Sequence, residues 1–448
     1  MSHAPSFLAQ PVVRRAERAV FVVFALNGFH FANFAARVPS VRDGLALTPQ
    51  QMGLLLLVGS IGSLVALPVS GLLVQRFGAA ATVRGFAVVN VTGLVLASTM
   101  VELGAPVLVA LSMFVFCVGT SVWDSAMNIE GTVVERHRGA TILPRLHAGF
   151  SLGTVAGAAT GALAAWAHLS LVTHFLLVLL PSLTVVLLVT RAFLPLEKAV
   201  VSAVSAGAVP EVAVSEGAGL DGGAVLDGGT VADVGAPATP ASARRSNAGR
   251  AARAWGEPRT LLLGLVVLAA AVTEGAANDW MALAVVDGFD VTNATGAVFF
   301  GVFVTAMTVG RFAGGAMLDR FGRVVVLRAS AALAIAGLLL FALPPSLTLT
   351  AVGAVLWGLG AAVGFPVGIS AAADDPAHAA MRVPVVATIG YSAFLVGPPA
   401  LGFLADVVGY RYAMLAIAVP AVLSLIVAGV ARPVADAEEP APRASLEA

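Results

Sequence analysis

Polar side chains at helical spacing interrupt several otherwise apolar stretches of the sequence. The first stretch, residues 18–38, carries the set Asn27, His30, Asn33, Phe34 and Arg37. All of them except Asn33 recur at steps of three or four residues, so we expect them to share one face of a helix. Amide groups both donate and accept hydrogen bonds, which suits this face to a hydroxylated solute. For His30 a packed neutral side chain is an equally good interpretation, and Arg37 can neutralise either an anionic solute or Asp43.

Carboxylates in two further stretches are candidates for proton coupling. The polar residues are Asp124 and Asn128 within 106–129, and Glu274, Asn278, Asp279 and Trp280 within 260–285. An ionisable side chain at the centre of a bilayer costs about 2.5–3.5 kcal/mol, so it is expected to face a partner or a water-filled cavity. Because the proton affinity of a carboxyl group depends on burial and nearby charge, we predict that Asp124, Glu274 and Asp279 load and release a proton. For Asp124 and Glu274 the structural alternative is a bond between neighbouring helices.

The candidate solute-binding set is completed by Asn128, Asn278, Trp280 and Tyr391, and one further stretch carries a polar face. A third polar face, in residues 147–167, consists of His147, Ser151 and Thr154. Tyr391 occupies the matching region of a later stretch, and Asn128 and Asn278 offer further amides. Trp280 is suited to stacking on a sugar ring, although tryptophan also anchors helices at a membrane interface. Arg311 lies inside another apolar stretch and needs a partner that the sequence does not identify.

The composition shows why these side chains stand out. Of the 448 residues, 58% are hydrophobic and 11% are charged, against about 45–50% and 25% in an average soluble domain. The 25 basic and 25 acidic residues cancel, so there is no basic surplus to attract nucleic acid. The single cysteine excludes an internal disulfide and a cysteine-based metal cluster. A polytopic helical membrane protein remains, because backbone polar groups in lipid must be paired within each span.

Twelve segments are apolar enough and close enough to about 20 residues to span a bilayer. They are 18–38, 52–75, 83–102, 106–129, 147–167, 171–191, 260–285, 295–318, 324–344, 347–371, 385–405 and 411–431. Most basic residues fall on the side of the N-terminus, so the positive-inside rule predicts that both termini are cytoplasmic. We therefore expect a multi-pass protein of the cell membrane.

Residues 195–258 differ in composition from the sequence on either side. Gly, Ala, Ser and Asp dilute the apolar residues there, which predicts a flexible cytoplasmic linker. The linker separates a six-helix bundle, 18–194, from a second one, 259–432. Short cytoplasmic tails, 1–17 and 433–448, complete the predicted domain organisation.

The two predicted bundles repeat each other. The sequence GLLVQRFG at 71–78 recurs as GAMLDRFG at 315–322, and the glycine-rich segments that begin at Gly149 and Gly390 align at nearly the same offset. Such a repeat predicts two copies of one six-helix unit, with a solute site between them near the middle of the membrane.

The segment at 315–323, Gly-Ala-Met-Leu-Asp-Arg-Phe-Gly-Arg, resembles the G-x-x-x-D-R-x-G-R signature of the major facilitator superfamily. The resemblance implies an all-α fold of twelve transmembrane helices in two six-helix pseudo-repeats, with helices one, four, seven and ten lining the cavity. It also implies that the motif latches a cytoplasmic gate. The implied gating residues are Gly71, Arg76, Gly78, Gly315, Asp319, Arg320, Gly322 and Arg323. The first copy departs from the signature, with Gln75 in place of the acid and Ala79 in place of the last arginine.

Four phrases together resemble a poorly characterised bacterial branch of that superfamily, near the fucose-permease-like sugar transporters. They are NGFHFANFAARVPSVRDGL (27–45), WDSAMN (123–128), LHAGFSLG (146–153) and EGAANDW (274–280). The expected function is secondary transport of a small polar, sugar-like solute by alternating access, coupled to protons. A proton-driven exporter and a solute-binding receptor without transport are the alternatives.

No nucleotide-binding loop or zinc-protease motif occurs in the sequence. We therefore expect no enzymatic activity, no cofactor and no metal site. The expected partners are a small-molecule solute, protons and the lipid bilayer, with no nucleic acid, and the protein is expected to be a monomer.

Overall fold

The computed structural model describes residues 10–194 and 253–433. Most of the predicted linker, 195–258, and most of both predicted tails lie outside these ranges. The described residues form helices and contain no β-strand. Twelve of the helical segments are long and apolar enough to cross a membrane. The prediction of an all-α protein with twelve transmembrane helices is therefore confirmed.

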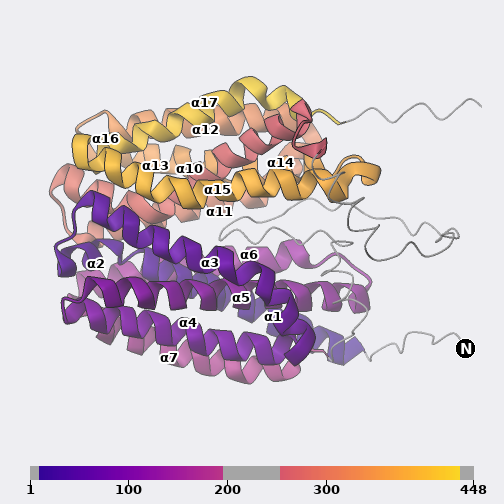
Figure 1. The fold of residues 1–448 in the computed structure, drawn as a ribbon, viewed down its shortest axis with the longest axis horizontal. Coiled ribbons are helices and arrows are strands. Elements are labelled where there is room, and N and C mark those ends of the chain that lie inside the picture. The colour runs from indigo at the N-terminus through magenta and orange to yellow at the C-terminus, as the bar shows by residue number, and fades with distance from the viewer. Residues whose placement is uncertain (1–9, 195–252, 434–448) are drawn as a thin grey trace, which may run out of the picture.

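The N-terminal half comprises seven helices. They are α1 (Gln10–Ala35), α2 (Val38–Leu45), α3 (Pro49–Phe77), α4 (Ala79–Glu102), α5 (Pro106–Arg138), α6 (Leu143–Trp166) and α7 (Leu171–Val189). The C-terminal half comprises α10 (Pro258–Phe289), α11 (Asn293–Phe321), α12 (Arg323–Ala342), α13 (Leu347–Ala361), α14 (Gly364–Ala372), α15 (Pro376–Val408), α16 (Tyr410–Ala413) and α17 (Ala418–Val427). Figure 1 shows the two halves as neighbouring bundles of roughly parallel and antiparallel helices.

Local sequence signals determine where several helices begin. At the start of α3, the hydroxyl of Thr48 accepts a hydrogen bond from the backbone N–H of Gln51, whose side chain bonds back to Thr48. This capping box satisfies backbone groups that a helix end otherwise leaves unpaired. Ser170 and Thr292 cap α7 and α11 through their hydroxyls in the same position.

The sequence repeat is also a structural repeat. Gly78 joins α3 to α4 with φ +84°, and Gly322 joins α11 to α12 with φ +75°, a backbone conformation that favours glycine. The helix crossings that follow also correspond. A Cβ at Gly119 would lie 2.5 Å from a backbone nitrogen of α4, and a Cβ at Gly360 would lie 2.4 Å from one of α12. Both halves therefore rely on glycine for the same close approach of two helices.

The two halves meet along two helix pairs, α3 with α15 and α6 with α11. Gly53 on α3 allows the first close contact, because a Cβ there would lie 2.7 Å from the carbonyl oxygen of Pro398. Many large apolar side chains face outward instead, including Leu72, Leu177 and Val407. Exposed apolar side chains over the surface of a helical bundle fit a lipid environment.

Candidate functional site

A small cavity, with room for about one water molecule, lies between the two halves. Its lining comes from α1 and α6 on one side and from α10 and α11 on the other. The lining residues are Phe31, Phe150, Ser151, Thr154, Glu274, Asn278, Met307, Thr308 and Arg311. We refer to this space as the central cavity. Of the residues predicted to bind solute or protons, the structure brings Glu274 and Asn278 to it.

Glu274 and Arg311 form an ion pair in the wall of the central cavity. The Nη2 group of Arg311 donates a hydrogen bond to Oε1 of Glu274 over 2.8 Å. Both residues are buried, with exposures of 7% for Arg311 and 5% for Glu274. Arg311 therefore has the partner that the sequence did not identify, and that partner is one of the predicted coupling residues.

Two polar atoms in the cavity wall lack hydrogen-bond partners in the described structure. They are Nε of Arg311 and Oδ1 of Asn278, and both are buried. The hydroxyls of Thr154 and Thr308 each donate to a carbonyl oxygen one turn back on their own helix. Their oxygens keep acceptor capacity, since a hydroxyl oxygen carries two lone pairs. The wall thus combines a charge pair, an amide and hydroxyls on an apolar background, as small-molecule sites do.

His147 adds a titratable group near the cavity. It lies on α6, close enough to Arg311 of α11 for an electrostatic interaction across the boundary between the halves. The ring packs edge-on against Phe24 at 5.2 Å between centroids. Its Nε2 atom is buried and has no hydrogen-bond partner among the described residues.

The α1 residues His30 and Asn33 point into the N-terminal half rather than the central cavity. The two ring nitrogens of His30 lie 2.8 Å from Oδ1 of Asn90 and 2.5 Å from the hydroxyl of Ser182. The Oδ1 atom of Asn33 lies 3.0 Å from Nε2 of His174. These contacts tie α1 to α4 and α7, which corresponds to the packed interpretation of His30.

Phe34, Arg37 and Asn27 have different surroundings. Phe34 packs against Phe116 of α5 at 5.3 Å between ring centroids. Arg37 donates through Nη2 to the carbonyl oxygen of Leu169 over 2.8 Å and so binds the α6–α7 connection. Asn27 is 2% exposed, and its Nδ2 group lacks a partner in the described structure. Asn27 lies one turn from the cavity residue Phe31 on the same helix face.

Asp124 and Asn128 interact with each other on α5. The Nδ2 group of Asn128 donates to the backbone carbonyl oxygen of Asp124 over 3.0 Å and lies 3.4 Å from its carboxylate. Asp124 is half-buried and Asn128 is buried. Neither residue belongs to the lining of the central cavity.

Asp279 and Trp280 face a second small cavity, between α10 and α15. Its other lining residues are apolar and include Phe394 and Pro398. Tyr391 lies one turn from Phe394 on α15, and its ring packs against those of Phe394 and Phe365. α10 therefore presents its carboxylates to two different cavities.

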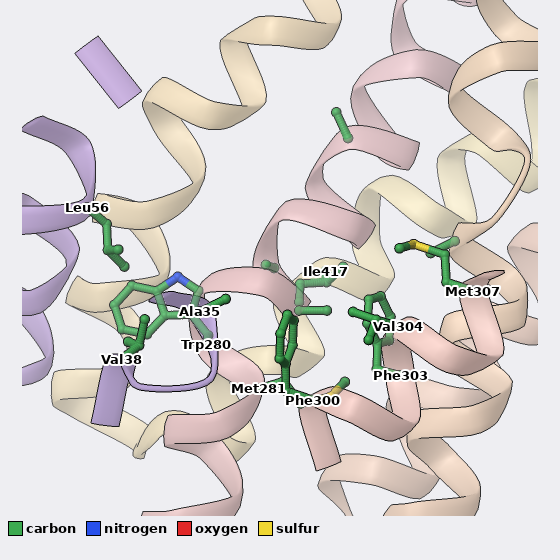
Figure 2. Close-up of a cluster of buried hydrophobic side chains, with 14 of the residues drawn as sticks. Ala35, Val38, Leu56, Trp280, Met281, Phe300, Phe303, Val304, Met307 and Ile417 are labelled. Carbon is green, nitrogen blue, oxygen red and sulfur yellow. The ribbon is translucent and has the colours of Figure 1, made fainter. Parts of the chain in front are cut away.

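Trp280 also closes an apolar contact between the halves. It is fully buried and belongs to one cluster with Ala35, Val38 and Leu56 of the N-terminal half. Figure 2 shows the indole beside these three side chains, with Met281 and Phe300 further into the C-terminal half. The same indole packs on the Tyr410 ring at 5.7 Å between centroids. A fully buried indole does not lie at a membrane interface, and the solute-stacking role stays a prediction.

Polar contacts join the halves at the end of the bundle that carries α2 and α16, which we term the α2 end (Figure 1). Arg42 on α2 donates two hydrogen bonds of 2.7 Å to the carboxylate of Asp287 on α10. Asn293 of α11 donates to Asp43 over 2.8 Å. These hydrogen bonds connect the two halves at the α2 end.

The predicted gating motifs lie at the opposite end of the bundle. Gly71 and Arg76 belong to the last turns of α3, and Gly315, Asp319 and Arg320 to the last turns of α11. Arg323, at the start of α12, bonds to Asp374 and, over 3.2 Å, to the hydroxyl of Ser370. Asp374 also lies 3.4 Å from the guanidinium of Arg259. These contacts connect α10, α12 and the α14–α15 turn within the C-terminal half.

Sequence reasoning missed several residues that the structure places in functional positions. Phe31, Phe150, Met307 and Thr308 line the central cavity, but their residue types are common in apolar helices. Thr308 lies three residues before Arg311, so the two side chains share one face of the helix. This spacing was the one signal in the sequence that could have predicted Thr308 as a lining residue. Glu130 was also missed. It is 3% exposed, and its carboxylate accepts a 2.6 Å hydrogen bond from the backbone N–H of Leu194.

No group of three or more metal-binding side chains occurs among the described residues. The prediction of no metal site stays a prediction.

The chain is similar in sequence to known membrane transporters. A family model described as Major Facilitator Superfamily matches residues 263–447. The uncharacterized transporter y4wD of Sinorhizobium fredii is 29% identical over 417 residues, which are 92% of this chain and 97% of that protein.

Two solved transporters share the fold. The nucleoside transporter NupG superimposes with a TM-score of 0.64 at 14% identity, covering 94% of this chain and 99% of that one. The Escherichia coli fucose:proton symporter FucP superimposes with a TM-score of 0.57 at 15% identity, covering 93% and 98%. At these identities the likeness concerns the fold alone.

Twelve apolar helices in two repeated halves, together with these matches, define a multi-pass membrane transporter of solutes rather than an enzyme. These matches agree with the resemblance to the major facilitator superfamily that the signature at 315–323 carries.

Proposed function

We propose that this protein is a secondary active transporter that moves a small polar solute by alternating access, coupled to protons. The observation that carries the proposal is the buried Glu274–Arg311 pair in a cavity lined by both halves. Burying such a pair in a nearly chargeless interior costs free energy. Its presence there therefore indicates a functional role.

Coupling rests on the carboxylate of Glu274. The ionised carboxylate forms an ion pair with Arg311. The protonated carboxyl group is neutral and has no charge for Arg311 to balance. A proton on Glu274 therefore changes what Arg311 can bind next. Asp124 and Asp279 remain secondary candidates, since each is half-buried on a helix near the cavities. The fold is shared with FucP, which is a fucose:proton symporter, so it is compatible with proton-coupled transport of a polar solute.

Alternating access rests on the contacts between the halves. At the α2 end, Arg42 and Asp287 together with the buried Trp280 hold the halves together. Opening a path at that end requires these contacts to separate, while α3–α15 and α6–α11 pivot on each other. The predicted cytoplasmic termini make the α2 end extracellular, so the described state is closed toward the outside. A monomer is sufficient for this mechanism.

Transport is tested with the full chain in liposomes. A pH gradient is imposed with the acid side outside, so that protons are driven inward. Uptake of a panel of labelled sugars and nucleosides is then measured. We expect accumulation of at least one solute in the wild type. E274Q should lose accumulation and keep exchange, whereas E17Q should behave as wild type, because Glu17 pairs with Arg138 away from the cavity.

The other possible outcomes identify the alternatives. Accumulation of solute in acid-loaded vesicles, with none under the inward-directed proton gradient, indicates proton antiport and therefore a proton-driven exporter. Binding to purified protein without transport under any gradient indicates a receptor. Uphill accumulation by E274Q contradicts the assignment of Glu274 as the coupling residue.

A further inference from the structure

The central cavity has a simple charge inventory. Among its lining residues, Glu274 is the acid and Arg311 is the base, and the remainder are apolar, hydroxyl or amide side chains. The cavity is neutral while both are ionised. When Glu274 takes up a proton it becomes neutral, whereas an arginine guanidinium stays charged in proteins. A protonated cavity therefore carries one positive charge.

The geometry of the pair leaves part of the guanidinium unused. Glu274 bonds to Nη2 of Arg311, while the adjacent Nε–H is buried and has no partner in the described structure. Nε–H and Nη2–H lie side by side and match the two oxygens of a carboxylate. Glu274 occupies one of these two donors, so an incoming carboxylate competes with it at Nη2.

A neutral solute group does not balance the positive charge of this site. With Glu274 protonated, a hydroxyl on Arg311 leaves a buried cation without a counter-charge, which is strongly unfavourable. An anionic group restores neutrality and supplies both acceptor atoms. Charge and hydrogen-bond geometry thus favour the same kind of ligand.

We infer that the transported solute carries a carboxylate, which binds Nε and Nη2 of Arg311 when a proton displaces Glu274 from it. The inference rests on the proposed function and specifies its solute class. One proton and one monoanion enter together, and the cavity is neutral before and after. The hydroxyls of Ser151 and Thr308 and the amide of Asn278 remain for the uncharged part of the solute.

One other titratable group faces the pair. His147 lies on α6 within electrostatic range of Arg311, and a proton on it is the other possible source of a pH dependence. The test therefore includes H147Q. Asp279 faces the second cavity from the opposite side of α10.

The test measures thermal unfolding of the purified full-length protein in the presence of paired compounds. The two members of each pair differ in whether they carry the acid group. The pairs are galacturonate and galactose, gluconate and glucitol, lactate and propane-1,2-diol, and benzoate and benzyl alcohol. At pH 6 we expect an acid to raise the melting temperature more than its neutral partner, with apparent affinity falling about tenfold or more by pH 8. E274Q should bind that acid equally at both pH values. H147Q should keep the wild-type dependence.

Removing the cation checks the binding partner. R311Q should lose acid binding by about tenfold or more. Because R311Q leaves Glu274 buried without a counter-charge, the double variant E274Q/R311Q serves as a second measurement and should also lose acid binding. The inference is overturned if no acid outperforms its neutral partner, or if either variant without Arg311 binds the acid as wild type does.

Transport separates this inference from the proposed function. Proton–monoanion uptake moves no net charge, so the rate should not change when a potassium gradient with valinomycin sets the membrane potential. Uptake of neutral compounds alone contradicts the inference and leaves proton-coupled transport intact. Acid binding in detergent with no transport in liposomes contradicts the proposed function and leaves the anion site intact.

Discussion

The guanidinium of Arg42 donates one Nη group to both carboxylate oxygens of Asp287, at 2.7 Å each, and the two residues belong to different halves of the protein. Both side chains keep some exposure, 14% for Arg42 and 37% for Asp287. Exposed ion pairs contribute about 0–1 kcal/mol, which is small against the stability of the fold. The same energy is large in an equilibrium between two states of similar free energy.

Breaking this pair should shift the protein toward a state that is open at the α2 end. For D287A we expect up to about fivefold more labelling of a cysteine at position 31, in the cavity, by a reagent added on the α2 side. The measurement uses F31C in a C117S background, because Cys117 is the single native cysteine. E17A, which breaks an ion pair within one half, is the matched control. Unchanged labelling in D287A would show that the apolar contacts alone hold this end closed.

The buried Glu274–Arg311 pair makes a different prediction, about stability. Removing one member leaves an uncompensated buried charge and should destabilise the protein by about 3–5 kcal/mol. The double replacement E274L/R311M removes both charges at similar volume and should recover most of that loss. Chemical denaturation of the purified variants measures the difference. Additive losses in the double variant would mean that the two side chains do not interact.

The glycine face of α6 should be intolerant of any side chain. A Cβ at Gly153 would lie 1.8 Å from the carbonyl oxygen of Ala25 on α1, so the two helices must separate. We expect G153A to lower the free energy of unfolding by about 1–3 kcal/mol. The control is G85A on α4, where a Cβ meets no atom within 4 Å. That substitution should be neutral or slightly stabilising, since alanine favours a helix over glycine.

A pH-dependent contribution to stability is expected at the end opposite α2. The carboxylate of Glu257, just before α10, binds the guanidinium of Arg382 at 2.6 Å and 2.7 Å, and this bond holds its pKa below the ordinary value of 4.5. A lowered pKa stabilises the fold above about pH 4.5 and loses that effect as the pH falls through the folded-state value.

Melting temperatures of wild type and E257Q measured between pH 7 and pH 4 test this. The wild type should be the more stable at pH 7, and the difference should shrink below about pH 4.5. A difference that stays constant to pH 4 would indicate that Glu257 contributes through packing rather than charge.

The sequence was sufficient for the spans, the repeat and the polar face of α10, because each depends on local hydropathy or helical period. It was not sufficient for the partner of Arg311. The helical period determines which residues share one face of a helix. Which other helix that face contacts depends on the rotation and crossing angle of the helices, and these are set by packing.

The same limit explains His30. It shares a helix face with Asn27 in the sequence pattern, yet small differences in angle around α1 direct it to Asn90 and Ser182 instead of the cavity. Phe31, one residue later, lines the cavity. A phenylalanine in an apolar stretch gives no signal that distinguishes a cavity wall from a core.

The two halves are copies of one unit, yet both charged side chains of the central cavity come from the second copy. In the first copy, buried histidines on α1 and α7 are engaged in contacts that fasten its own helices. The second copy thus supplies the charged groups of the cavity, whereas the first copy uses its buried histidines to hold its own helices together. Changes of solute or ion preference are therefore expected to arise first on α10 and α11, while the first copy preserves the framework against which they work.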